Sequence, residues 1–198
     1  MEAPVANAIN AWFYRQMAIW AGLLKRDELS LEYWERVFAL RPRDAATALT
    51  IAHRRAERGE RRQAVAMVEK AIEIDPDRAA AWFNLGFLLQ ELGEHEDALR
   101  AFDRAVALDE KLDRAWYGKA LSLLNLGRVD EAIAPLKKNT ELQPMSPYGY
   151  YQLAHAWHRL GKHERVIGTI RQLSRFEPKV AKQLEREIGV DAGVPDPY

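Results

Sequence analysis

A spacing of 34 residues recurs along this chain. Glycine stands at it four times in succession, at Gly59, Gly93, Gly127 and Gly161. Proline follows the same spacing in a second column, at Pro42, Pro76, Pro144 and Pro178, with Glu110 in the skipped place. Two independent columns with one period are hard to obtain by chance, and a fixed period of roughly 20–50 residues is typical of repeat architectures. The period therefore predicts a stack of similar structural units.

Each period carries two helical patterns. In the third period, Trp82 and Leu85 share one helical stripe, and Ala98 and Phe102 share another after Gly93, where a helix commonly ends. One position is small in every period: Ala18, Ala52, Gly86, Ala120 and Ala154. A small residue lets two helices approach closely. We therefore expect five helix-turn-helix units, at about 11–44, 45–78, 79–112, 113–146 and 147–180.

The ends of the chain depart from the repeat. Residues 179–189 predict a capping helix that ends at Gly189, so that residues 1–190 form one solenoid. Residues 191–198 contain two prolines and a glycine, and we expect a flexible tail there. Inside the array, Lys25 replaces the turn glycine, Pro135 is expected to kink the second helix of the fourth unit, and Asn139 fills a column that is otherwise small and apolar.

The third unit resembles a known repeat family. The segment Trp82-Phe83-Asn84-Leu85-Gly86, followed by Gly93, Ala98, Phe102 and Ala105, is similar to the signature of the tetratricopeptide repeat. The resemblance implies an all-α, right-handed α-solenoid of about five repeats plus a C-terminal capping helix. It also implies a concave groove that is lined by the first helix of each pair and binds partners.

One column of the repeat is mostly aromatic and reads Tyr14, Ala48, Trp82, Trp116 and Tyr150. Counting from this aromatic column places particular residues on that groove. In the second unit these are Leu49, Thr50 and His53. In the later units we take the candidate groove residues to be Phe83, Asn84, Phe87, Arg114, Tyr117, Leu121, Tyr148, Tyr151, Gln152, His155 and His158. The surface is aromatic and mostly uncharged, and such surfaces usually mark interaction sites. The alternative is that the rings pack against neighbouring repeats or the cap.

Some members of the family grip a peptide carboxylate with a clamp of lysine, arginine and asparagine. Asn84 and Arg114 match two clamp positions, but Leu49, His53 and Gly118 stand where its other polar groups belong. We therefore expect an apolar peptide segment or an amphipathic helix as the ligand.

Composition narrows the class of function. The 198 residues include 29 basic and 29 acidic residues, whereas nucleic-acid binders usually show a basic surplus. The chain has no cysteine, which removes disulfides and cysteine metal sites and fits a reducing compartment. The apolar stretch from Ala3 to Leu24 is interrupted by Asn7, Asn10 and Arg15, and so predicts an amphipathic helix. We expect a cytoplasmic protein with no nucleic-acid partner and no stable membrane insertion.

No catalytic constellation is recognisable in the sequence. Gly161-Lys162 lacks the upstream glycine of a phosphate-binding loop, and serine-hydrolase and zinc-protease motifs are absent. His155 and His158 face one way on a helix, with His163 across the next turn, but zinc sites take three or four ligands with a second shell. We expect no enzyme activity, no cofactor and no metal.

Two further clusters leave alternatives open. Arg54, Arg55, Arg58, Arg61 and Arg62 form a basic patch that is either a solvated edge or a site for an acidic partner. The first unit is rich in aromatic residues, notably Trp12, Phe13 and Trp20, which either seal the end of the core or form a second interface.

The function that we expect is a protein-interaction scaffold or chaperone-like adaptor that holds a partner protein or peptide in the groove. The alternative is an assembly subunit or self-associating protein, a homo-oligomer whose interface is the aromatic first repeat.

Overall fold

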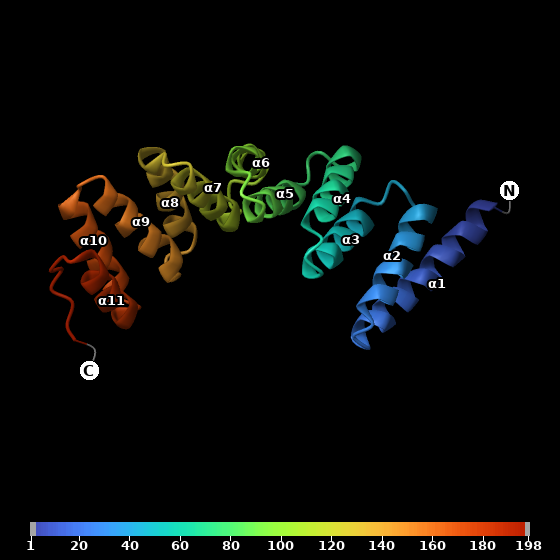
Figure 1. The fold of residues 1–198 in the computed structure, drawn as a ribbon, viewed down its shortest axis with the longest axis horizontal. Helices are drawn as coiled ribbons and strands as arrows, with labels where there is room; N and C mark the ends of the chain where they lie inside the picture. The colour runs from blue at the N-terminus through green and yellow to red at the C-terminus, as the bar shows by residue number, and fades with distance from the viewer. Residues whose placement is uncertain (1–2, 197–198) are drawn as a thin grey trace. The chain divides into compact units, whose positions relative to one another are not determined.

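The computed structural model describes residues 3–196, and within that range it contains eleven α-helices and no strand. In chain order they are α1 (Ala3–Leu23), α2 (Asp27–Leu40), α3 (Ala45–Glu57), α4 (Arg61–Ile74), α5 (Ala79–Glu91), α6 (His95–Leu108), α7 (Asp113–Asn125), α8 (Val129–Leu142), α9 (Pro147–Arg159), α10 (His163–Ser174) and α11 (Pro178–Ile188). They follow one another as helix-turn-helix pairs with a last helix at the C-terminal end (Figure 1). The predicted all-α fold of repeated pairs plus a terminal helix is confirmed.

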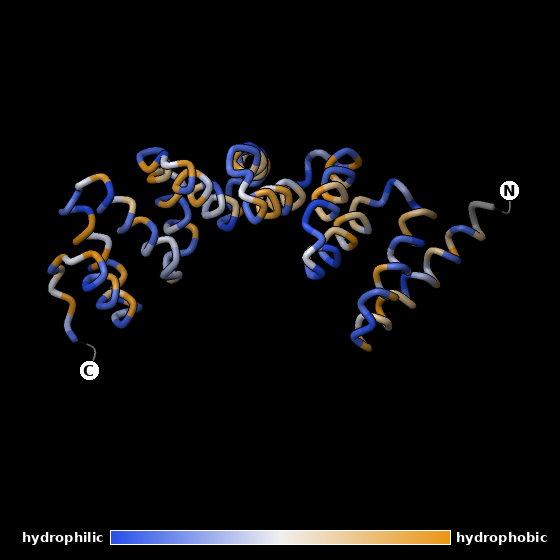
Figure 2. Tube along the Cα trace, viewed as in Figure 1, coloured by the Kyte–Doolittle hydropathy of each residue, from blue (hydrophilic) through white to orange (hydrophobic). Residues whose placement is uncertain are grey.

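The described helices fall into two compact units, divided between Gly93 and Glu94. Each of these units contains more than one repeat, and from here on the first and second unit mean these two parts of the chain. In the first unit, α1 packs on α2 and α3 packs on α4, while α2–α3 and α4–α5 contacts join successive pairs. In the second unit each helix from α6 to α11 packs on the next one in sequence. Hydrophobic residues alternate with hydrophilic ones along the coils of the helices, as Figure 2 shows. In each unit, packing against sequence neighbours buries apolar faces that one pair alone would leave exposed.

The turn between the two helices of a pair ends on a residue whose backbone has a positive φ, in the left-handed helical region. Gly59, Gly93, Gly127 and Gly161 have φ values of 78, 79, 75 and 67°. Lys25 occupies the same column before α2, and its φ is 55°. A residue with a Cβ atom pays roughly 1–2 kcal/mol to adopt this conformation. The first turn therefore keeps the geometry of the others without the residue type that favours it.

The small column lies in the core of the pairs α1–α2, α3–α4, α7–α8 and α9–α10. Ala18, Ala120 and Ala154 are fully buried, and Ala52 is nearly so. Each of them stands on the first helix of its pair, opposite an apolar residue of the second helix, such as Trp34, Leu136 or Ile170. Close approach of the two backbones is the reason that only small side chains occur at this column.

Three of the first helices are tied to the loop that precedes them. In each, the aromatic residue of the repeat pattern donates a hydrogen bond to a backbone carbonyl six residues earlier. The pairs are Trp82 to Pro76 at 2.8 Å, Trp116 to Glu110 at 2.9 Å and Tyr150 to Pro144 at 3.3 Å. The accepting carbonyls belong to the column in which proline recurs. Glu110 can replace proline in this column because the acceptor is a backbone carbonyl, which every residue has. Ala48 stands in the donor column of the second repeat and cannot make this bond.

The fourth repeat accommodates its two unusual residues in different ways. Helix α8 runs through Pro135, which is buried. Asn139 is also buried, and its Nδ2 donates to the carbonyl of Asp113 at 3.0 Å. The asparagine therefore ties α8 to the first residue of α7, where a small apolar residue would only pack.

The C-terminal segment differs from the predicted flexible tail. Ala192 and Val194 are buried in the core that Leu184 and Ile188 of α11 help to form. The carboxylate of Glu185 accepts hydrogen bonds from the backbone N–H of Ala192 at 2.7 Å and of Val194 at 3.4 Å. Residues 197 and 198 of the predicted tail lie outside the described residues. The segment is ordered because its apolar side chains are buried and its backbone donors find a buried acceptor.

The N-terminal aromatic residues separate into two groups. Trp34 is buried, and the rings of Tyr14 and Tyr33 stack at 6.0 Å. Trp12, Phe13 and Trp20 are 63%, 51% and 61% exposed on α1. The interpretation that the aromatic residues seal the core therefore applies to the first group and not to these three.

Candidate protein-binding surfaces

The first unit contains a hollow between α3, α4 and α5, which we call the α5 hollow. Its volume is about 100 Å³. It is lined by Leu49, Ala52, His53, Ala56, Val68, Asn84, Phe87 and Leu88. Two of the lining residues of α3 are alanines, Ala52 and Ala56, and their small side chains leave the space open. The floor is apolar, and His53 and Asn84 supply the polar groups.

Two of the three residues predicted for this region line the α5 hollow. Phe87 stands at its edge with 49% of its surface exposed, and Asn84 lies one turn earlier on the same helix. Phe83 is half-buried, and its ring stacks on that of Phe87 with the centroids 6.5 Å apart. The stacking holds Phe87 in place beside the hollow. Leu49 and His53, which the counting also placed on the groove, line the hollow from α3.

The second unit carries the other predicted residues, which we call the tyrosine surface. Arg114, Tyr117 and Tyr148 line a hollow of about 280 Å³ between α7, α8 and α9. Tyr148 is 69% exposed, whereas Tyr117 is half-buried. Burial raises the pKa of Tyr117, and a hydrogen bond with the Gln152 amide only partly offsets this. This tyrosine is therefore a neutral hydroxyl at physiological pH, able to donate or accept a hydrogen bond.

The far end of the tyrosine surface is joined to the capping helix. The Tyr151 hydroxyl donates to Glu187 Oε2 at 2.6 Å, and the rings of Tyr151 and His155 lie 4.7 Å apart. His155 Nε2 lies 3.8 Å from the same carboxylate oxygen. Burial lowers the pKa of His155, and the Glu187 carboxylate only partly offsets this, so the imidazole is neutral at physiological pH.

Glu187 was not predicted from the sequence. It stands on α11, outside the repeat columns, and no spacing relates it to Tyr151. Hydrogen bonds from Tyr151 and from Gln183 lower the pKa of this carboxyl group, so it remains ionised and adds one negative charge to the tyrosine surface, which also contains Arg114. The remaining predicted residues are less enclosed: Leu121 and Gln152 are half-buried, and His158 is exposed.

The basic patch of the second repeat is matched by carboxylates of the same unit. Arg55 contacts Glu35 at 2.5 Å and Glu60 at 3.1 Å, and Arg58 contacts Glu60 at 2.7 Å. Arg61 contacts Glu91 at 3.0 Å in the same way. These pairs neutralise much of the patch, which favours the solvated-edge interpretation over a site for an acidic ligand.

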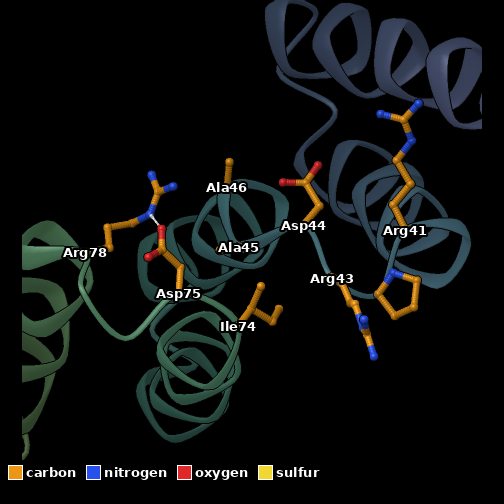
Figure 3. A pocket seen from close by; sticks show the side chains of 9 residues that line it. Arg41, Arg43, Asp44, Ala45, Ala46, Ile74, Asp75 and Arg78 are labelled. Carbon is orange, nitrogen blue, oxygen red and sulfur yellow. Dashed lines mark hydrogen bonds and ion pairs between the residues drawn. The ribbon is translucent and has the colours of Figure 1, made fainter.

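A wider hollow of about 650 Å³ lies where the loops before α3 and α5 approach each other. Figure 3 shows its lining, in which Arg41 and Arg43 point in different directions and Arg78 donates to Asp75. Asp44 is occupied in capping α3, since it accepts from the Thr47 N–H at 3.1 Å. The two arginines do not converge on one point, and this hollow therefore lacks the geometry of an anion site.

Residues 3–196 contain neither a candidate metal site nor a candidate membrane span. No group of three or more His, Asp or Glu side chains in this range is arranged to hold a metal ion. None of the helices in the same range has both the length and the apolar character needed to cross a membrane.

Comparison with known proteins addresses the fold. Family profiles described as tetratricopeptide repeat match residues 55–122 and residues 113–144. No curated protein sequence matches the chain.

Among solved structures, the crystal structure of MamA protein has a TM-score of 0.80 at 21% identity, with 87% of this chain and 94% of that chain covered. The structure of MamA 41-end from Desulfovibrio magneticus RS-1 has a TM-score of 0.76 at 19% identity, with coverages of 90% and 96%. The crystal structure of YrrB, described as a TPR protein with an unusual peptide-binding site, has a TM-score of 0.74 at 20% identity, with coverages of 87% and 90%. At these identities the likeness concerns the fold.

Proposed function

The chain is a tetratricopeptide repeat protein, and from that premise we propose that it is a protein-interaction scaffold that holds a segment of a partner protein. Stacked helical pairs present long side-chain surfaces, which is how repeat proteins bind their partners. We propose the α5 hollow and the tyrosine surface as the places of contact, with no catalytic step and no cofactor. A chaperone-like adaptor in the cytoplasm is the role that fits this activity.

The observation that carries the proposal is the α5 hollow beside an exposed Phe87. An apolar cavity of about 150 Å³ holds a benzene molecule. The α5 hollow, at about 100 Å³, has room for one aliphatic side chain of a partner. Phe87 adds an exposed ring at its edge, and a ring next to a pocket is the usual composition of a binding hot spot.

The tyrosine surface supports a different kind of contact. Tyr117, Tyr148 and Gln152 offer neutral hydrogen-bonding groups, and the two hydroxyls sit on large flat rings. Tyrosine combines contact area with a polar end and is enriched at interfaces for that reason. We propose that this surface binds backbone or polar side-chain groups of the partner, while the α5 hollow takes an apolar anchor.

The proposal can be tested by selection from a phage-displayed library of random peptides against the purified chain. We expect the enriched peptides to share an aliphatic residue. Ala56→Phe fills the α5 hollow and is expected to weaken binding of a labelled peptide at least tenfold, as measured by fluorescence anisotropy. Ala66→Phe is the matched control, because Ala66 is exposed on α4 and does not line the hollow.

A second variant, Tyr117→Ala/Tyr151→Ala, addresses the tyrosine surface by itself. The opposite result is that the selected peptides bind this variant and Ala56→Phe as tightly as they bind wild type, with helicity unchanged in both variants. That result would show that the proposal of partner binding at these two surfaces is wrong.

A further inference from the structure

Helix α1 has an apolar face that no described residue covers. Its inner face packs on α2 through Ala11, Ala18 and Ala21, all of which are buried. On the opposite face, six apolar residues are between 42% and 69% exposed. They are Ile9, Trp12, Phe13, Ile19, Trp20 and Leu23, and we call them the α1 stripe. With Gln16 at their centre they stand at steps of one and three residues, and so lie on one face along the helix.

The area of the α1 stripe is large for a free surface. Aromatic side chains carry about 150–250 Å² each, so the exposed parts of its three rings amount to about 300–400 Å². The three aliphatic residues add a similar amount, which gives about 600–800 Å² per chain. The largest apolar patch of a typical monomer is about 300–600 Å². A stable interface buries about 800 Å² on each partner, and two stripes in contact would come close to that area.

The order of residues in the α1 stripe is symmetric about Gln16. Ile9 and Leu23 stand seven residues to either side of it, Trp12 and Trp20 four, and Phe13 and Ile19 three. Two antiparallel copies of α1 related by a two-fold axis at Gln16 would therefore place every apolar residue opposite another apolar residue. Such a self-complementary patch is what an isologous interface requires.

From this symmetry and area, we infer that the α1 stripe binds a second copy of this chain in an antiparallel, two-fold dimer. Trp12 of each protomer faces Trp20 of the other in this arrangement. Gln16 meets its own copy at the axis, where two amides can exchange donor and acceptor roles, and one polar residue in an apolar seam fixes the register of paired helices.

The low number of charged residues on α1 favours a second copy of the chain over a membrane surface as the partner of the α1 stripe. Among the described residues of α1, Arg15 is the one charged side chain. Helices that lie on membranes usually carry a lysine- and arginine-rich polar face that is attracted to anionic lipids. Two nearly uncharged helices can pair without like-charge repulsion. The dimer is independent of partner binding at the α5 hollow and the tyrosine surface.

Sedimentation equilibrium at increasing concentration tests the inference. We expect the wild-type chain to be a dimer at micromolar concentrations, and Trp12→Glu and Trp20→Lys each to raise the dimer dissociation constant at least tenfold. Both tryptophans are more than half exposed, so circular dichroism is expected to show unchanged helicity. Mixing the two variants should restore a dimer, because the antiparallel register pairs the new glutamate with the new lysine and leaves one Trp–Trp contact intact.

The absence of cysteine in the natural sequence allows a second test of the register. Gln16→Cys is expected to form an interchain disulfide on mild oxidation, and Glu32→Cys, at an exposed position of α2, is the control that should remain unlinked.

Three results would overturn the inference: a wild-type chain that stays monomeric, a dimer that both tryptophan variants leave unchanged, or a mixture that fails to recover the dimer. A monomeric chain that sediments with phosphatidylglycerol vesicles, and no longer does so when Trp12 is replaced, would show that the α1 stripe binds a membrane surface instead.

Discussion

Replacing Glu185 by alanine is expected to destabilise the second unit by about 2–4 kcal/mol. The carboxylate of Glu185 is only 5% exposed, and it accepts hydrogen bonds from Lys182 at 2.6 Å and from the backbone of Ala192 at 2.7 Å. A hydrogen bond to a charged group contributes about 1.5–3 kcal/mol, and removal of one partner of a buried ion pair costs about 3–5 kcal/mol. Residues 192–194 can move into water after the substitution, which recovers part of that loss.

Urea unfolding followed by circular dichroism measures the effect, with Glu141→Ala, at an exposed position of α8, as the control. Hydrogen exchange at the amides of Ala192 and Val194 separates a local release of this segment from unfolding of the whole unit. A loss of stability within about 0.5 kcal/mol of the control, together with unchanged exchange, would refute the role assigned to Glu185, because exposed sites usually stay within that range.

The same carboxylate predicts a dependence on pH. Burial opposes ionisation of Glu185, but the bonds from Lys182, Ala192 and Val194 outweigh it, so the pKa of this group lies below its ordinary value. A group with a lowered pKa in the folded state stabilises the fold above its unfolded pKa, about 4.3 for glutamate, and loses that contribution as the pH falls through the folded pKa. The difference in stability between wild type and Glu185→Gln should therefore be constant near neutral pH and shrink below about pH 4.

Four further substitutions test the packing, one turn and one hydrogen bond, each by urea unfolding. Gly118→Ala is expected to destabilise the second unit by about 1–2 kcal/mol, because an added Cβ would lie 2.4 Å from the buried ring of Phe102. Gly168→Ala has open space around the added Cβ and should stabilise the same unit by about 0.5–1 kcal/mol. Equal effects of the two substitutions would contradict this packing argument. Lys25→Gly should stabilise the first turn by about 1 kcal/mol, since φ there is 55°, and a loss of stability would show that the lysine side chain compensates for its backbone. Trp116→Phe removes one hydrogen bond and should cost about 1 kcal/mol, and an unchanged midpoint would mean that the bond does not contribute.

The repeated part of the fold could be predicted from the sequence because its determinants are local and periodic. A left-handed turn needs glycine, a helix crossing needs alanine, and each requirement recurs at 34 residues. Even the exception at Lys25 keeps the left-handed conformation of its column, since the helices on both sides fix the turn.

The features that could not be predicted depend on residues outside the columns. Glu187 contacts Tyr151 from the capping helix, and Glu185 orders a segment whose composition is typical of a flexible tail. Both are single carboxylates on α11 whose partners are set by tertiary packing, and neither sequence spacing nor residue type indicates them. The exposure of Trp12 and Trp20 was also ambiguous, because a helical stripe has the same spacing whether or not another surface covers it.

The bond from the aromatic column to the preceding loop has a consequence for how such an array can grow. The acceptor is a main-chain carbonyl, which every residue type provides, and the donor lies six residues later in the same continuous stretch of chain. A gene duplication that copies one period copies donor and acceptor together, and no compensating mutation is needed elsewhere. Substitution of the proline, as at Glu110, leaves the bond in place. Lineages can therefore lengthen or shorten the protein by whole periods while its junctions stay intact, and the side chains between them are free to diverge toward new partners.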